Sequence, residues 1–272
     1  MHVLFTITFV VYVLATIIYF TGAAFTHDAL RKYAFYAFVA AAAGHVVYFG
    51  WRWWAKFDYL PYISFLNAAP IRGAFEYSVA LALGMAIIVI LARPKMPWII
   101  SVGMPATTLM MGFASLPINN PQISDLMPAL RSPWFFVHAG TGTVAYAAFA
   151  VACIAGIKYL TMLKKNEDEE SKTMIQIDRM SYRAIVFGML FFTVTIISGS
   201  IWAADSWGRF WFWDPKELWS LITWIFYAIY LHQRLRKNWR GKLTAIMAIV
   251  GVGLVLFTWL GVNNLLYGLH SY

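Results

Sequence analysis

Charged residues are scarce in this chain. Asp, Glu, Lys and Arg make up 12% of its 272 residues, about half the share of roughly 25% that is usual for a soluble domain, while 61% are hydrophobic. This composition excludes a water-soluble globule. Apolar runs of about 20 residues recur along the chain, and each is long enough to cross a hydrocarbon core of roughly 30 Å. We therefore expect an all-α, polytopic integral membrane protein that is surrounded by membrane lipid.

Cysteine is almost absent too. Cys153 is the single cysteine and lies within an apolar run, which excludes an internal disulfide and a Cys-x-x-Cys redox pair. Any thiol chemistry would have to come from a separate protein. The first apolar run, from His2 to Phe20, lacks a basic leader and a small-residue cleavage site, so we expect a retained span. Residues 1–272 are expected to form a single membrane domain without an appended soluble domain.

Eight spans are expected from the apolar runs, which would place both termini on the same side of the membrane. Their approximate ranges are 2–22, 33–51, 73–92, 97–116, 134–163, 184–204, 218–233 and 243–266. Fourteen basic residues fall in one set of connecting loops and six in the other. The positive-inside rule makes the richer set cytoplasmic, so both termini are expected on the outer face. The net charge of +9 is thereby explained by topology and does not indicate nucleic-acid binding.

The longest inner loop, 164–183, mixes charges of both signs and spaces Met174, Ile177 and Met180 at helical intervals. This pattern favours a solvated, partly interfacial connector over a docking site for a cytoplasmic partner.

Tryptophan is concentrated at one outer position, in the segment IWAADSWGRFWFWDPKELWSLITW at about 202–219 and just beyond. An aromatic belt at the headgroup level explains some of these residues but not their density. Asp214 is placed to cap the next helix, with Pro215 at its first position and Glu217 at its third. Such a rigid aromatic shelf suits a large planar apolar ligand.

The sequence of this segment is specific enough to indicate a family. WGRFWFWDPKELW, followed by TWIFYAIYLH, resembles the WWD signature of haem-handling proteins that build c-type cytochromes, in particular the CcsA/ResC branch of the System II cytochrome c synthase. SPWFFVHAGTG and the C-terminal NNLLYGLHSY are similar to that branch as well. The resemblance implies that haem b, as a bound substrate, crosses the membrane and is held at the outer face against the Trp-rich loop. It also implies that two flanking histidines ligate the haem while apocytochrome c docks.

The expected spans agree with such a site. His138 begins the fifth span and His270 follows the eighth, so both would lie at the depth of the Trp-rich loop. Two neutral imidazoles could then supply both axial ligands of the iron, whereas each taken alone is explained as an interfacial histidine bonded to water or backbone. Arg209 and Lys216 could pair with haem propionates or form a loop salt bridge. The loop residues expected to contact haem are Trp207, Trp211, Trp213, Asp214 and Trp219.

His232 is expected elsewhere. It follows Asp214 by 18 residues on one helix, hence about 27 Å along the axis, near the cytoplasmic end of the seventh span. A histidine at this depth is a candidate iron ligand, although a residue that caps the helix C-terminus is the plainer alternative. Its trans ligand would have to come from another polypeptide, and the resemblance implies a CcsB/ResB-like membrane partner.

Two further polar residues fall inside expected spans. His45 is interpreted as a buried packing histidine rather than a haem or relay residue. Glu76 is expected to pair with Arg72, four residues earlier on the chain. The apolar outer segment from Leu116 to Pro133 could form a lid or docking surface over the haem.

The resemblance implies a haem-handling subunit that acts jointly with its partner as a holocytochrome c synthase of the haem lyase type. Haem would be attached through thioethers to the Cys-x-x-Cys-His motif of the apocytochrome, with no catalytic side chain required from this chain. The site would face the periplasm of a bacterial cytoplasmic membrane, or the thylakoid equivalent. Alternatives are a CcmC-type protein that passes haem to a chaperone, a di-haem membrane electron carrier, and a secondary transporter.

Overall fold

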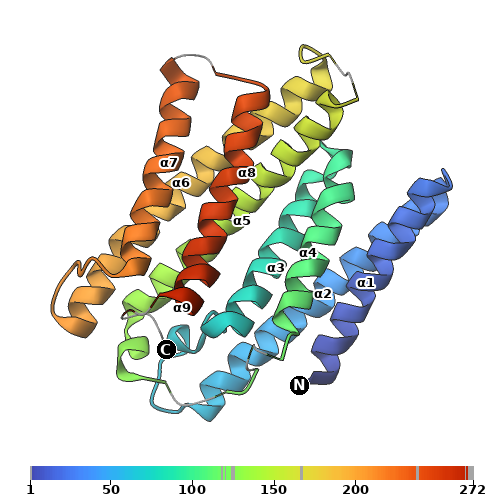
Figure 1. Ribbon diagram of the computed structural model, residues 1–272. Helices are drawn as coiled ribbons and strands as arrows, with labels where there is room; N and C mark the ends of the chain where they lie inside the picture. The colour runs from blue at the N-terminus through green and yellow to red at the C-terminus, as the bar shows by residue number, and fades with distance from the viewer. Residues whose placement is uncertain are drawn as a thin grey trace. The chain divides into compact units, whose positions relative to one another are not determined.

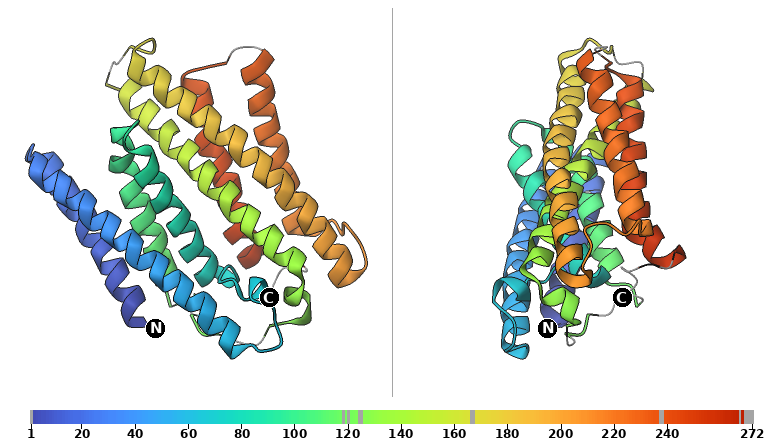
Figure 2. Two further views of the ribbon diagram at one scale, coloured as in Figure 1. Left: turned by 180° about the vertical axis from the view of Figure 1, so that it is seen from behind. Right: turned by 90° about the vertical axis from the view of Figure 1, so that its left-hand side faces the viewer.

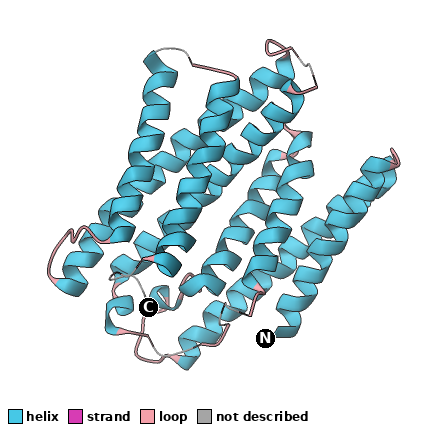
Figure 3. Cartoon of the chain, in the orientation of Figure 1, coloured by secondary structure: helices cyan, strands magenta, loops and turns pink. Residues whose placement is uncertain are grey.

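The computed structural model describes residues 2–117, 119, 121–123, 126–165, 168–236, 239–266 and 268, without the side chains of 2, 263 and 264. Within these residues every regular element is helical (Figure 3). The all-α prediction is therefore confirmed. Two compact units divide the chain, Met1–Phe136 and Val137–Tyr272.

The helices lie at the expected spans, although α2 and α6 extend well beyond theirs. The first unit contains α1 (His2–Ala24), α2 (Asp28–Tyr59), α3 (Gly73–Ala92) and α4 (Ile100–Ala114). The second contains α6 (Lys172–Trp207), α7 (Pro215–Arg236), α8 (Lys242–Leu256) and α9 (Val262–Leu265), and α5 (Pro133–Leu163) leads into it. A π-helical turn, Phe257–Gly261, joins α8 to α9 without a break.

Seven helices of the described chain are long and apolar enough to cross a membrane, and α7 is not among them. Eight spans with both termini outside therefore stay a prediction, while the polytopic membrane architecture is confirmed.

In the N-terminal unit, α1 packs along α2 and α3 along α4, as Figure 1 shows in blue to green. Thr16 and Thr108 show how polar side chains of these apolar helices bond to one another. Pro105 lies inside α4, and nearby Thr108 Oγ1 donates to the Met104 carbonyl at 3.0 Å and lies 2.9 Å from Thr16 Oγ1 of α1. Such bonds satisfy polar side chains inside a membrane bundle.

In the C-terminal unit, α5 and α6 run side by side (Figure 2) and share a core with α7 and α8. Phe149 of α5 stacks on Tyr227 of α7, with ring centroids 4.0 Å apart. A Cβ on Gly156 would lie 2.6 Å from the Ala245 carbonyl oxygen, so this glycine allows α5 to approach the α8 backbone. Small residues thus bring these helices into close contact.

The inner loop corrects one expectation. Helix α6 begins at Lys172, because Ser171 caps it by accepting a hydrogen bond from the Met174 amide at 3.3 Å. Met174 and Ile177 are fully buried, whereas Gln176 and Arg179 are exposed, so the second half of this loop is a helix with one face in the core. The helical spacing was the informative signal, and the mixed charges were misleading because Asp178 is paired internally with Arg234.

Candidate functional site

The loop between α6 and α7 is fixed at both ends by helix caps. Gly208 ends α6 in the left-handed conformation, at φ 80°, and its amide donates to the Ala204 carbonyl at 2.9 Å. At the other end, Asp214 accepts from the Lys216 amide at 3.0 Å, and Glu217 accepts from the Asp214 amide at 3.2 Å. The predicted capping of α7 is therefore confirmed, and the loop is held at a defined length.

The aromatic side chains at the end of α6 and in the loop form two sets. Trp202, which is 1% exposed, meets Trp207 edge to face at 5.0 Å, and Trp207 meets Phe212 at 6.5 Å. In contrast, Trp213 is 68% exposed and Phe210 is 65% exposed. The first set anchors the loop on α6, and the second presents ring area outward.

Trp213 also has an unusual backbone. Its φ is +57°, in the left-handed region that a bulky side chain rarely adopts. The residue is held there between Trp211, whose ring lies 5.9 Å away at 87°, and the buried cap residue Asp214. Strain of this kind clusters at sites that bind ligands.

Two cationic side chains, Arg209 and Lys216, flank the exposed rings of the loop in sequence. Burial lowers the pKa of the Lys216 ammonium to about 8, and the neighbouring Asp214 carboxylate opposes this shift. Arg209 is exposed on the loop. The two cations therefore lie on either side of the exposed rings along the chain.

The C-terminal segment reaches the same loop. Gly268 lies so close to Asp214 that a Cβ there would overlap the carboxylate oxygen Oδ1. Trp219 of α7 packs on Phe257 of the π-helical turn, with ring centroids 4.4 Å apart. His270 lies outside the described residues, two positions after Gly268.

His138 contacts the same aromatic group. Its half-buried ring lies over Trp202, with centroids 5.7 Å apart and an interplanar angle of 25°. Its Nδ1 lies 2.9 Å from the Thr195 carbonyl oxygen of α6. The structure thus brings His138, the Trp-rich loop and the segment before His270 into one unit.

His232 lies apart from that group. It is exposed near the end of α7, about 27 Å along the helix from Asp214, and its depth near the cytoplasmic end of a span stays a prediction.

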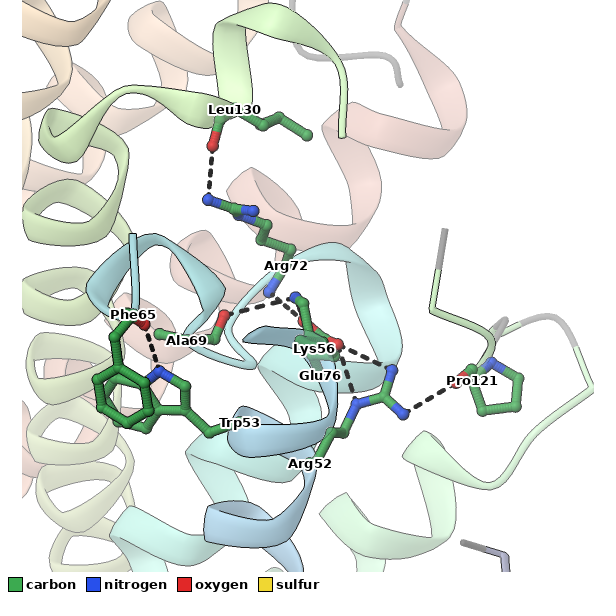
Figure 4. Close-up of polar contacts among 9 residues, drawn as sticks. All are labelled: Arg52, Trp53, Lys56, Phe65, Ala69, Arg72, Glu76, Pro121 and Leu130. Atoms are coloured by element: carbon green, nitrogen blue, oxygen red, sulfur yellow. Dashed lines mark hydrogen bonds and ion pairs between the residues drawn. The ribbon is translucent and has the colours of Figure 1, made fainter. Parts of the chain in front are cut away.

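A buried charged cluster in the N-terminal unit was largely missed by the sequence reasoning (Figure 4). Glu76 forms ion pairs with Arg52 at 2.8 Å and Lys56 at 2.6 Å. The expected partner, Arg72, donates its backbone amide to Glu76, and its guanidinium donates to the Leu130 carbonyl. The error arose because the second span was expected to end at residue 51, whereas α2 continues to Tyr59 and carries both cations into the interior.

His45 packs as interpreted. It is fully buried, and its Nδ1 lies 3.4 Å from the hydroxyl of Tyr12 on α1. Its ring also meets the Tyr12 ring edge to face at 5.9 Å. The described contacts of His45 therefore join α2 to α1.

Comparison with known proteins identifies the family. Residues 73–270 match the family model described as cytochrome c assembly protein. The chain is similar to proteins named cytochrome c biogenesis protein CcsA: it is 43% identical to that of Chlamydomonas reinhardtii over 173 residues, 62% of this chain and 49% of that protein. It is also 39% identical to that of Prochlorococcus marinus strain NATL1A over 212 residues, 65% of this chain and 67% of the relative.

A third relative, from Prochlorococcus marinus strain MIT 9301, is 34% identical over 233 residues, which is 75% of either chain. The chain thus spans about half of the algal relative and two thirds to three quarters of the two cyanobacterial ones. By the extent of these matches, this chain belongs to the cytochrome c assembly protein family.

Proposed function

We propose that this chain is the haem-handling subunit of a System II cytochrome c synthase. It holds haem b, as substrate, between His138 and His270 against the Trp-rich loop, and presents it to apocytochrome c. The observation that carries the proposal is the exposed ring of Trp213 on a strained backbone, in the loop that follows α6, where Trp202 lies against His138. A planar apolar ligand would cover such rings by stacking and area burial.

Electrostatics support the same site. Haem carries two propionates, and Lys216 and Arg209 offer cations on either side of the exposed rings. Asp214 and Glu217 cap α7 and hold the loop, and the two cations would attract an anionic propionate.

The chemistry requires orientation more than a nucleophile. In thioether formation, the sulfur and hydrogen of each apocytochrome thiol add across a haem vinyl double bond, so nothing is oxidised or released. Holding thiol and vinyl group together supplies much of the rate. The chain's one cysteine, Cys153, lies within the membrane-spanning part of α5, which is consistent with all reacting thiols coming from the apocytochrome.

His232 is proposed to bind haem on its way to the outer site, with a CcsB/ResB-like membrane partner supplying the opposite ligand. Support comes from its exposure at the end of α7, where a partner helix can approach the imidazole. The relatives in a cyanobacterium and an alga favour a bacterial cytoplasmic or thylakoid membrane as the location.

The test is to express the chain with a ResB-like partner, purify the complex in detergent, and record the reduced absorption spectrum with a pyridine haemochrome assay. Low-spin haem that falls in His138→Ala and His270→Ala is expected. His27→Asn is the matched control, because Asn keeps the capping function that His27 has at α2. A complex without haem would overturn the proposal, and co-purification with a haem chaperone in place of the ResB-like protein would indicate delivery instead.

A further inference from the structure

Gly199 lies within α6, where the helix itself does not require a glycine. A Cβ at this position would lie 2.7 Å from Nδ1 and 2.9 Å from Cε1 of His138, closer than real Cβ contacts. Glycine lowers helix stability in such a place, so its presence has another physical basis. The imidazole of His138 rests directly on the α6 backbone, and only a glycine leaves room for it.

The ring is oriented by what it meets there. Nδ1 of His138 lies 2.9 Å from the Thr195 carbonyl oxygen, and a carbonyl oxygen can only accept a hydrogen bond. Nδ1 must therefore carry the proton in this contact. In a neutral imidazole the lone pair then belongs to Nε2, the nitrogen on the far side of the ring.

Three positions on one face of α6 make this arrangement. Thr195 supplies the acceptor, Gly199 the space and Trp202 the platform under the ring, at helical spacings of four and three residues. The Thr195 hydroxyl also donates to Thr141 Oγ1 at 3.0 Å, which fixes α5 to α6 less than one turn beyond His138.

We propose that Gly199 is a positioning residue for His138. By admitting the ring to the Thr195 carbonyl, Gly199 keeps His138 in the tautomer with hydrogen on Nδ1, so that Nε2 is the atom that binds iron. When the other ring nitrogen of a ligating histidine donates a hydrogen bond in this way, the ligating nitrogen also becomes a stronger electron donor to the metal. The role in iron binding rests on the proposed function, whereas the tautomer and its dependence on Gly199 do not.

The first test uses the haem-free full chain in bilayers. Magnetic resonance of isotopically labelled histidine nitrogens, with the His138 signal assigned by its loss in His138→Ala, should show hydrogen on Nδ1. In Gly199→Ala this signal should shift or split. The matched control is Gly188→Ala on the same helix, where a Cβ would lie 2.6 Å from the Phe149 ring and the His138 signal should not change.

The second test measures haem in the complex with its partner. Gly199→Ala should lower low-spin haem at the outer site about tenfold, and added imidazole should restore the spectrum, while folded Gly188→Ala should keep the wild-type spectrum. Hydrogen on Nε2 in the wild type, or an unchanged His138 signal in Gly199→Ala, would overturn the positioning role. If Gly199→Ala does not fold, the position of the hydrogen on His138 in the wild type still tests the proposed orientation of the ring. The expected tautomer in a complex that never binds haem would uphold the positioning role and refute the proposed function.

Discussion

The two polar regions of this protein use their side chains in opposite ways. In the N-terminal unit, Arg52, Lys56 and Glu76 are each less than 10% exposed, and their charges meet one another. In the C-terminal unit, the Trp-rich loop leaves Trp213 and Phe210 mostly exposed and holds Trp213 in a strained conformation. A network closed on itself contributes to folding alone. In contrast, a loop with exposed rings and a strained backbone can be stabilised further when a ligand binds to it.

The largest effect is expected for Glu76→Gln, because it leaves Arg52 and Lys56 buried beside a neutral amide. Removing one partner of a buried ion pair typically destabilises a protein by about 3–5 kcal/mol. Thermal unfolding in detergent should show this loss, while any folded fraction keeps its haem spectrum. Asp58→Asn, at an exposed position of the same helix, is the control. Equal stability of Glu76→Gln and wild type would mean that the charges of Arg52 and Lys56 do not depend on Glu76 for their stabilisation.

Trp213→Gly should separate stability from binding. Removing the φ strain gains about 1–2 kcal/mol, which offsets the roughly 1 kcal/mol that glycine loses in chain entropy. Thermal stability should therefore stay level or rise, whereas haem affinity should fall about tenfold, or about 1.4 kcal/mol. Phe210→Gly removes a similarly exposed ring at a position of negative φ and should lower stability as well. A loss of stability in Trp213→Gly with unchanged haem affinity would make Trp213 structural.

Gly208→Ala tests the other left-handed residue of the loop. This substitution adds φ strain, so it should lower the stability that Trp213→Gly leaves level or raises. A Cβ there meets nothing within 4 Å, so the cost is the φ of 80° alone, about 1–2 kcal/mol of stability. Gly253→Ala is the control, since its surroundings are equally open but its backbone is helical, and it should stabilise α8 by up to about 1 kcal/mol. Unfolding curves that order the two variants the other way would contradict the strain argument.

The smallest effect concerns pH. Burial lowers the pKa of Lys216 to about 8, so its ammonium is charged below that pH and neutral above it. If it pairs with a propionate, haem affinity should fall about threefold as pH rises from 7 to 9, the scale of a partly exposed ion pair. Haem titrations of Lys216→Arg should give a flat profile, because arginine stays protonated. Identical profiles for both proteins would exclude the pairing.

Much of this architecture could be predicted from the sequence, because membrane helices must satisfy their backbone internally and so follow the apolar runs. The third span, expected at 73–92, is α3 to the residue. The capping of α7 was also predictable, since Asp214 and Glu217 act on neighbouring amides within one turn.

The errors share a physical cause. Glu76 and Lys56 are 20 residues apart, and Asp178 and Arg234 are 56 apart, so these partners meet only once the helices have packed. The second span was expected to end at residue 51, which left Lys56 outside it, and the mixed charges of 164–183 indicated a solvated connector, although pairing allows charged residues to enter the interior. The contact of His138 with Thr195 belongs to the same class, since a backbone acceptor on another helix leaves no mark in composition.

The π-helical turn at Phe257–Gly261 has a consequence for how the chain can vary. Each residue of an α-helix advances the chain by about 100° around the axis, and a π turn holds one residue more than an α turn. The direction in which α9 and Gly268 leave the bundle is therefore offset from the core-facing side of α8. Substitutions that repack Ala248 or Val255 need not change the direction of the C-terminal arm, whereas deletion of a single residue within the turn would rotate that arm away from Asp214 and also shift the packing of Phe257 on Trp219.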